Sequence, residues 1–309
     1  MKQLQNRIAE GGLTLPVAAA GGLAVWLLSG LVSKGMWPQL VLFILTVYNL
    51  IELSNSNALL RVRSRMVSST FIVLSAMACY LFDSVTGAMA QFCFSSFLLL
   101  LFHTYQNKQS TGRTFYAFLF IGVASLVFVH ILWLVPAIWI LMATQLQSLS
   151  GRTWLASLIG LAAPFWFLSL WFIYQQDFTP LGAHMAQLWD FRTPHYSFQL
   201  SHVLVYVFTL LLTTVGILHF WRFSFEDKIR IRLLFGFFTT MTILLFVLCA
   251  AQPQLANVLM RLVFLVASPL IAHLFTFTSG KLSNILFFST LGLALAIIGF
   301  NIYMLSAQP

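Results

Sequence analysis

The chain has 309 residues, of which 60% are apolar and 7% are charged. An average soluble domain carries roughly 25% charged residues, so this composition excludes an ordinary soluble fold. The net charge is +9. Because the basic residues flank long apolar runs, they indicate membrane topology and contact with anionic lipid, and they do not indicate nucleic-acid binding.

The apolar runs approach 20 residues, the length at which a helix crosses a hydrocarbon core of about 30 Å. A helix satisfies its own backbone hydrogen bonds in lipid, and the ten-residue alternation typical of barrel strands is absent. The sequence therefore predicts an all-α polytopic transmembrane bundle of about eleven spans, a single integral membrane domain over residues 1–309 with no soluble domain. The expected spans are 13–32, 37–53, 66–82, 88–105, 114–130, 131–147, 154–174, 201–221, 233–251, 255–277 and 283–305.

The stretch 114–147 fits either two short spans or one long helix bent at Pro136. Arg113 and Arg152 flank this stretch, and both favour the cytoplasm, so the chain must cross an even number of times between them. The charges therefore favour two spans that turn near His130.

Lys and Arg are enriched in cytoplasmic loops, so their distribution predicts orientation. With the N-terminus cytoplasmic and the C-terminus outside, the outer segments hold only Lys34 and Arg192, and Arg261 falls within a span. The other basic residues are all on the inner side: Lys2, Arg7, Arg61, Arg63, Arg65, Lys108, Arg113, Arg152, Arg222, Lys228, Arg230, Arg232 and Lys281. This asymmetry predicts a multi-pass protein of the bacterial inner membrane.

Polar residues on the inner side are expected to have structural roles. Glu226 and Asp227 are predicted to pair with Arg222 and Arg230 on their own loop, where surface pairs contribute little. His103, His219 and His273 fall at inner helix ends, where an interfacial or helix C-terminal position is expected.

The outer side is the predicted location of a functional site. Its longest loop, 175–200, carries a polar cluster made of Asp177, His184, Asp190, Arg192 and His195. Imidazole and carboxylate are common metal ligands, but the cluster has no HxH or HxxxH spacing, so no metal site is predicted. Interfacial hydrogen bonding is the expected role of these side chains.

Arg261 is the most informative residue within a span. It lies six residues into the tenth span, about 9 Å from the outer end, and Asn257 lies one turn above it on the same face. A guanidinium in the membrane is costly and usually faces a cavity or a partner, and it matches phosphate geometry well. Arg261 and Asn257 are therefore candidate contacts for a lipid phosphate. The alternative is that Arg261 extends outward to ordinary head groups.

From about residue 37 to 200 the order of features resembles the GT-C-type membrane glycosyltransferases. A basic turn, Arg61 to Arg65, leads into a span that ends at the acid Asp83. A second basic turn at Lys108 and Arg113 precedes Gly122-Val-Ala-Ser-Leu-Val-Phe-Val-His-Ile-Leu-Trp-Leu-Val-Pro136. The resemblance implies a sugar donor carried on polyprenyl phosphate at the outer face, with Asp83 matching an outer-face acid of the family, as a candidate catalytic residue, and Arg261 as a donor-phosphate contact.

One departure from that family concerns the catalytic residue. Such enzymes carry an acid on a long first outer loop, whereas the loop here is Ser33 to Met36 and has no Asp or Glu. In this the chain is similar to uncharacterised bacterial multi-pass proteins with a truncated first outer loop. Without that acid a general base within reach of the acceptor is missing, unless Asp83 replaces it.

Three functions therefore remain open. The first is a GT-C-like protein of the cell envelope, active or degenerate, that handles a polyprenyl-phosphate-linked sugar or a phospholipid. The second is a non-enzymatic partner of envelope-assembly proteins. The third is a transporter or flippase, which the absence of internal repeats disfavours. The expected partners are membrane lipids, and the sequence specifies no cofactor.

Overall fold

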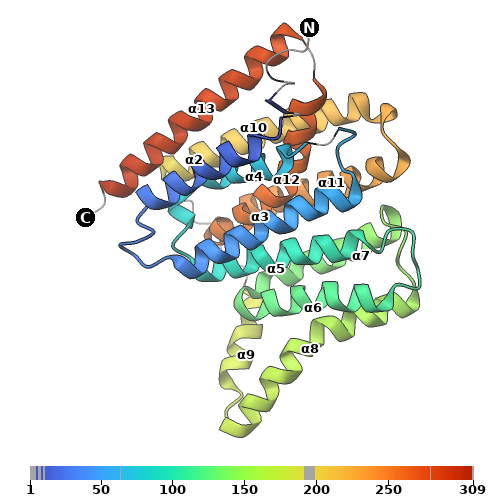
Figure 1. The fold of residues 1–309 in the computed structure, drawn as a ribbon. Helices are drawn as coiled ribbons and strands as arrows, with labels where there is room; N and C mark the ends of the chain where they lie inside the picture. Colours follow the sequence, from blue (N-terminus) through green and yellow to red (C-terminus); the bar gives the residue numbers. More distant parts are fainter. Residues whose placement is uncertain are drawn as a thin grey trace.

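The computed structural model describes residues 5, 8, 9, 11–62, 64–190, 199–278 and 280–307. Within these residues all regular elements are helices (Figure 1). The α-helices are α2 (Thr14–Leu28), α3 (Trp37–Asn57), α4 (Met66–Met77), α5 (Val85–Phe102), α6 (Thr111–Val127), α7 (Val135–Thr144), α8 (Gly151–Gln175), α9 (Thr179–Ala186), α10 (Leu200–Phe223), α11 (Ile229–Ala251), α12 (Ala256–Phe277) and α13 (Lys281–Ser306). Two short 3₁₀ helices extend the apolar segments, η1 (Cys79–Leu81) after α4 and η2 (Val129–Leu134) before α7.

Seven of the described helices are long and apolar enough to cross a membrane: α3, α5, α8, α10, α11, α12 and α13. Four shorter apolar segments coincide with the other expected spans: α2, α4, α6 and η2 with α7. Many large apolar side chains face outward, such as Trp166 and Phe167 of α8 and Leu282 of α13. Lipid is the solvent in which such a surface is stable, so the all-α fold indicates a membrane protein.

The stretch 114–147 forms two helices, as the charges predicted. α6 ends at Val127, Phe128 adopts a non-helical conformation with φ −141° and ψ 88°, and η2 and α7 follow. The N–H of Gln106, which precedes α6, donates to the carbonyl of Leu146, which follows α7, at 2.9 Å. The second helix therefore returns to the end of the bundle at which α6 begins.

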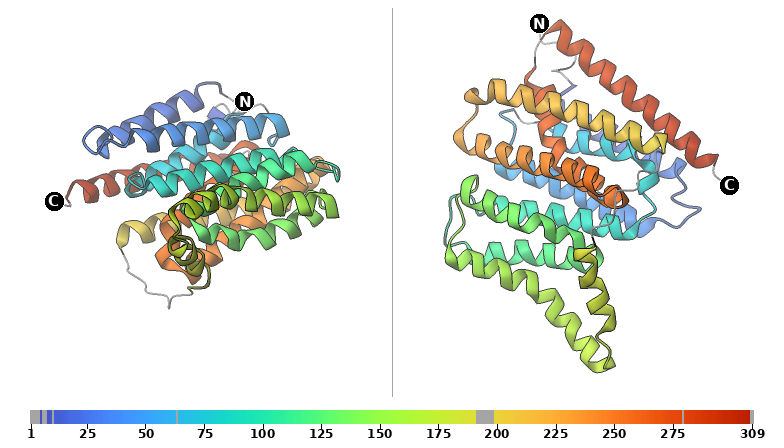
Figure 2. Two further views of the ribbon diagram at one scale, coloured as in Figure 1. Left: turned by 90° about the horizontal axis from the view of Figure 1, so that it is seen from below. Right: turned by 180° about the vertical axis from the view of Figure 1, so that it is seen from behind.

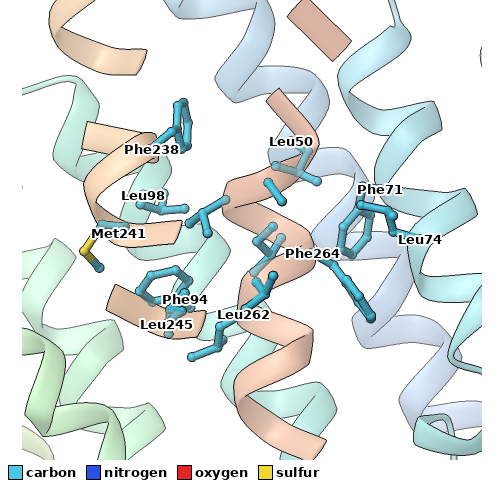
Figure 3. Close-up of a cluster of buried hydrophobic side chains, with 14 of the residues drawn as sticks. Leu50, Phe71, Leu74, Phe94, Leu98, Phe238, Met241, Leu245, Leu262 and Phe264 are labelled. Carbon is cyan, nitrogen blue, oxygen red and sulfur yellow. The ribbon is translucent and has the colours of Figure 1, made fainter. Parts of the chain in front are cut away.

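Helix α12 is the centre of the fold. All its residues from Leu259 to Thr276 are buried, and most of them are apolar, as expected of a helix in the core of a bundle. In Figure 3, Leu262 and Phe264 of α12 lie between Leu50 and Phe71 on one side and Phe94 and Leu245 on the other. The central helix contacts α4, α5, α10 and α11, and its residues from Leu259 to Thr276 face protein.

The helix ends form two faces of the bundle. The basic end includes residues 58–62, 64–65, 103–110, 145–150 and 224–228, and the opposite end includes 29–36, 78–84, 176–190 and 252–255. Helix α13 and the hairpin of α8 and α9 lie at opposite edges of the molecule (Figure 2). Gly160 lets α8 approach α6, because a Cβ there would lie 2.5 Å from the carbonyl oxygen of Phe115.

Candidate functional site

A polar pocket opens at the end of the bundle opposite the basic loops. Its volume is about 290 Å³, and we call it the polar pocket. Five segments form it: the turn after α2, η1 with the residues that follow it, and the adjacent ends of α10, α12 and α13. Its polar lining residues are Ser29, Lys34, Tyr80, Asp83, Gln199, Ser201, His202, Asn257 and Asn301.

Asp83 lies in this pocket because the chain turns between η1 and α5. The side chain of Gln39 donates from Nε2 to the Asp83 carbonyl at 3.0 Å, which ties the turn to α3. The next residue, Ser84, caps α5 by accepting a hydrogen bond from the Gly87 N–H at 3.0 Å. The turn is therefore fixed at both ends, and the exposed Asp83 side chain faces the pocket.

Lys34, Tyr80 and His202 complete the wall around Asp83. The rings of Tyr80 and His202 are 4.1 Å apart between centroids and inclined at 33°, so η1 and the start of α10 meet there. Lys34 supplies a positive charge from the turn between α2 and α3. An acid, a base and a cation thus surround one cavity, an arrangement suited to a polar or anionic head group.

Asn257 lines the polar pocket, whereas Arg261 lies one turn deeper and is absent from its lining. Arg261 is only 6% exposed. Its Nη2 donates a hydrogen bond to the carbonyl oxygen of Ser84 at 3.4 Å. The prediction that Arg261 extends outward to lipid head groups is wrong, because its guanidinium points into the protein against α5. No carboxylate of the described residues pairs with it.

Gly87 makes room for this arginine. A Cβ atom at Gly87 would lie 2.7 Å from the Nε of Arg261, so the close approach of α5 and α12 depends on glycine here. Gln91, one turn further along α5, donates to the Arg261 carbonyl at 3.1 Å. A buried cation therefore lies beside the first turn of α5, next to the residue that follows Asp83.

Comparison of the chain with protein-family models, with curated proteins and with solved structures finds no match.

The residues predicted as a polar cluster in loop 175–200 have separate local roles where the structure describes them. Asp177 lies at the exposed tip of the α8–α9 hairpin and accepts hydrogen bonds from the Thr179 N–H and Oγ1, which lower the pKa of its carboxyl. His184 contacts the Ser125 carbonyl through Nε2 at 2.8 Å and anchors α9 to α6. Asp190 lies just after η3 (Gln187–Trp189), and Arg192 and His195 lie outside the described residues. Within the described ranges, no group of three His, Cys, Asp or Glu residues has a geometry suited to a metal ion.

The basic end holds a buried polar network that corrects two predictions. Asp227 is paired with Arg61 of the α3–α4 loop at 2.8 Å, and Glu226 is paired with the same arginine at 3.0 Å. The predicted pairs with Arg222 and Arg230 are wrong, because the α10–α11 loop folds against a distant loop. Arg230 instead donates to the Asn57 Oδ1 at 2.7 Å.

His273 lies near the C-terminal end of α12, which is one of the two positions expected for it, but it is fully buried and therefore not interfacial. Its Nε2 lies 3.1 Å from Oδ2 of Asp227, whose side chain is 1% exposed. Arg61 also lies over the Phe277 ring at 4.5 Å. The sequence contained one signal for this network: Asp227 belongs to a pair of acids in an otherwise basic set of loops, and such an acid needs a partner when it is buried.

Proposed function

We propose that this chain is a multi-pass protein of the bacterial inner membrane that binds the head group of a phosphate-bearing lipid in the polar pocket. The pocket lies at the end opposite the basic loops, which the positive-inside rule assigns to the cytoplasm. This orientation has about eleven spans, a cytoplasmic N-terminus and an outer C-terminus. The ligand class is a polyprenyl-phosphate-linked sugar or a phospholipid of the outer leaflet.

The observation that carries this proposal is the position of Arg261 beside the pocket. A guanidinium without a carboxylate partner among the described residues leaves its positive charge uncompensated in a medium of low dielectric constant. The first turn of α5 adds the partial positive charge of a helix N-terminus at the same place. With Lys34 in the wall, these charges favour an anionic ligand, and hydroxyl groups of a sugar have partners in Asn257 and Asn301.

For glycosyl transfer, we assign the base to Asp83. Among the described residues that line the polar pocket it is the sole carboxylate, and its turn is held by Gln39 and by the Ser84 cap. This assignment supplies the acid that the short loop from Ser33 to Met36 lacks. A GT-C-like scaffold that binds its lipid without transfer keeps the same pocket and the same charges.

A second candidate function is a non-enzymatic role in envelope assembly. It is favoured by the second half of α8, where Trp166, Phe167, Trp171 and Tyr174 are exposed on a hairpin that projects from the bundle (Figure 1). A stoichiometric protein partner that copurifies with the wild type, together with no lipid specific to the polar pocket, would favour this role over the first.

Native mass spectrometry in mild detergent with added polyprenyl phosphate or phospholipid tests the first function. The wild type is expected to retain one lipid. Lys34→Gln should reduce its affinity about tenfold or more, since a hydrogen bond to a charged group contributes about 1.5–3 kcal/mol. Arg261→Gln should also weaken retention, because it removes the buried positive charge beside the pocket. Lys108→Gln, which removes an exposed cation at the basic end, is the matched control. Equal retention by all four proteins contradicts the proposal.

A further inference from the structure

A second cavity lies nearer the basic end and is bounded by the same helices. Its volume is about 570 Å³, and we call it the apolar groove. It opens sideways between α2 and α13, where Leu13 and Val17 are 77% and 68% exposed. Side chains from five helices form its walls, among them Val17, Val73, Phe208, Ile271, Phe287 and Leu291.

Of the four polar side chains that line the groove, three donate hydrogen bonds to backbone carbonyls, and one of these is Thr14, which donates to the Gly11 carbonyl at 3.1 Å. Ser69 donates to the Arg65 carbonyl at 3.0 Å, and Thr290 donates to the Phe287 carbonyl at 2.9 Å. The groove therefore offers mainly hydrocarbon contacts. Its chemistry fits an alkyl chain, because a polar group placed there would lose its hydrogen bonds to water.

The position of the groove along the membrane normal indicates which leaflet supplies the alkyl chain. Along α13 the groove runs from Phe287 to Ala294, which is six to thirteen residues after Lys281, or about 9–20 Å from the start of the helix. Half of a hydrocarbon core is about 15 Å. On α13 the groove therefore spans the midplane, whereas on α4 it runs from Met66, the first residue of that helix, to Leu74, within about 12 Å of the basic end. Over the two helices together, the groove lies mainly at the level of the leaflet on the basic side.

The polar pocket and the groove are separated by packed side chains. Met77 of α4, Val205 of α10 and Ile298 of α13 are buried between them. Asn301 donates from Nδ2 to the Met77 carbonyl at 2.6 Å and holds α13 against α4 at this level. A chain attached to a head group in the polar pocket would have to displace these contacts to enter the groove.

We propose that the apolar groove binds an acyl chain of an anionic phospholipid from the cytoplasmic leaflet. Two cations are assigned to its phosphate: Arg65, which directly precedes the groove residue Met66, and Lys281, which begins α13. Neither forms an ion pair within the described part of the chain. This second lipid site goes beyond the proposed function and shares with it only the cytoplasmic placement of the basic end.

The test fills the groove and leaves the rest of the surface unchanged. Ala18 lines the groove on α2, whereas Ala20 of the same helix is exposed and outside its lining. Ala18→Trp is compared with Ala20→Trp and the wild type by native mass spectrometry after incubation with palmitoyl-oleoyl phosphatidylglycerol. The wild type and Ala20→Trp are expected to retain one phosphatidylglycerol more than Ala18→Trp. Equal retention by all three proteins overturns the inference.

A second variant keeps the test valid if Ala18→Trp does not fold. Arg65→Gln combined with Lys281→Gln is expected to abolish the preference of the bound lipid for phosphatidylglycerol over phosphatidylcholine. An unchanged preference contradicts the assigned head-group site. If Lys34→Gln also loses this bound lipid, the acyl chain belongs to a lipid whose head group lies in the polar pocket. That result would overturn the assignment to the cytoplasmic leaflet. Since Lys34→Gln and Ala18→Trp act on different cavities, failure at one site is distinguishable from failure at the other.

Discussion

The Nε of Arg261 packs directly against Gly87, so closely that a Cβ atom at that glycine would lie 2.7 Å from it. Only a residue without a side chain leaves room for the arginine there. A charged residue of the central helix α12 is thus accommodated by the smallest residue of α5. The contact places the guanidinium beside the first turn of α5, adjacent to the pocket that contains Asp83.

Gly87→Ala is expected to destabilise the protein and weaken lipid retention together. Overpacking a buried site usually costs about 1–3 kcal/mol, more than the gain of up to about 1 kcal/mol from replacing glycine in a helix. Thermal unfolding in detergent measures the first effect and native mass spectrometry the second. Gly292→Ala on α13 is the control, because its added methyl group meets no atom within 4 Å. An unchanged melting temperature and unchanged lipid retention in Gly87→Ala would contradict this role of the glycine.

Asp227→Ala is expected to be among the most destabilising single changes at the basic end. It leaves Arg61 without its closest partner and removes the acceptor of the buried His273, and breaking a buried pair costs about 3–5 kcal/mol. Glu226→Gln removes the more exposed partner of Arg61 and should cost less than about 1 kcal/mol. The two variants are compared by thermal unfolding, and similar melting temperatures would show that the network is not important for stability.

His184→Ala is expected to release α9 without unfolding the bundle. The change removes the contact of Nε2 with the Ser125 carbonyl, worth about 1 kcal/mol. Hydrogen exchange should become faster in residues 179–186 and stay unchanged in α6 and α8. Gln187→Ala replaces an exposed side chain near the same helix and serves as control. Equal exchange in the two variants would mean that the histidine does not anchor α9.

Gly160→Val is expected to separate α8 from α6. Even one Cβ at this position would lie 2.5 Å from the Phe115 carbonyl oxygen and 3.1 Å from the Leu119 nitrogen, and backbone atoms cannot move aside as a side chain does. The expected cost is several kcal/mol, at or above the upper end of about 1–3 kcal/mol for overpacking. Gly151→Ala at the start of the same helix meets no atom within 4 Å and should have little effect. Thermal unfolding in detergent measures both, and a stable Gly160→Val would show that the helices can move apart freely.

Much of the architecture was predictable from the sequence because lipid imposes a strong rule on the backbone. Each expected span coincides with a helix or a pair of short helical segments, and 114–147 divides at Phe128 as the flanking arginines predicted. The number of membrane crossings and the orientation of the termini remain predictions. The short helix α9 was not predicted, because eight residues in a polar loop carry too weak a periodic signal.

The polar pocket was only partly predictable. The sequence indicated Asp83 and Asn257 because both are polar residues at the ends of apolar runs, and both line the pocket. It also placed Lys34 and His202 on the outer side, but it gave no reason to bring them into one cavity with Asp83, Asn257 and Asn301, because the five residues come from separate segments.

The sequence by itself determined the helical membrane class of this protein, since apolar length and charge spacing act locally along the chain. Tertiary structure alone decided the partners of its buried charges. Arg261 turns toward Gly87. Asp227 contacts Arg61, which lies 166 positions earlier in the sequence, and His273, which lies 46 positions later. The physical reason is that a buried charge is stabilised by whatever lies within a few ångströms, and helix packing sets those neighbours independently of their distance in the chain.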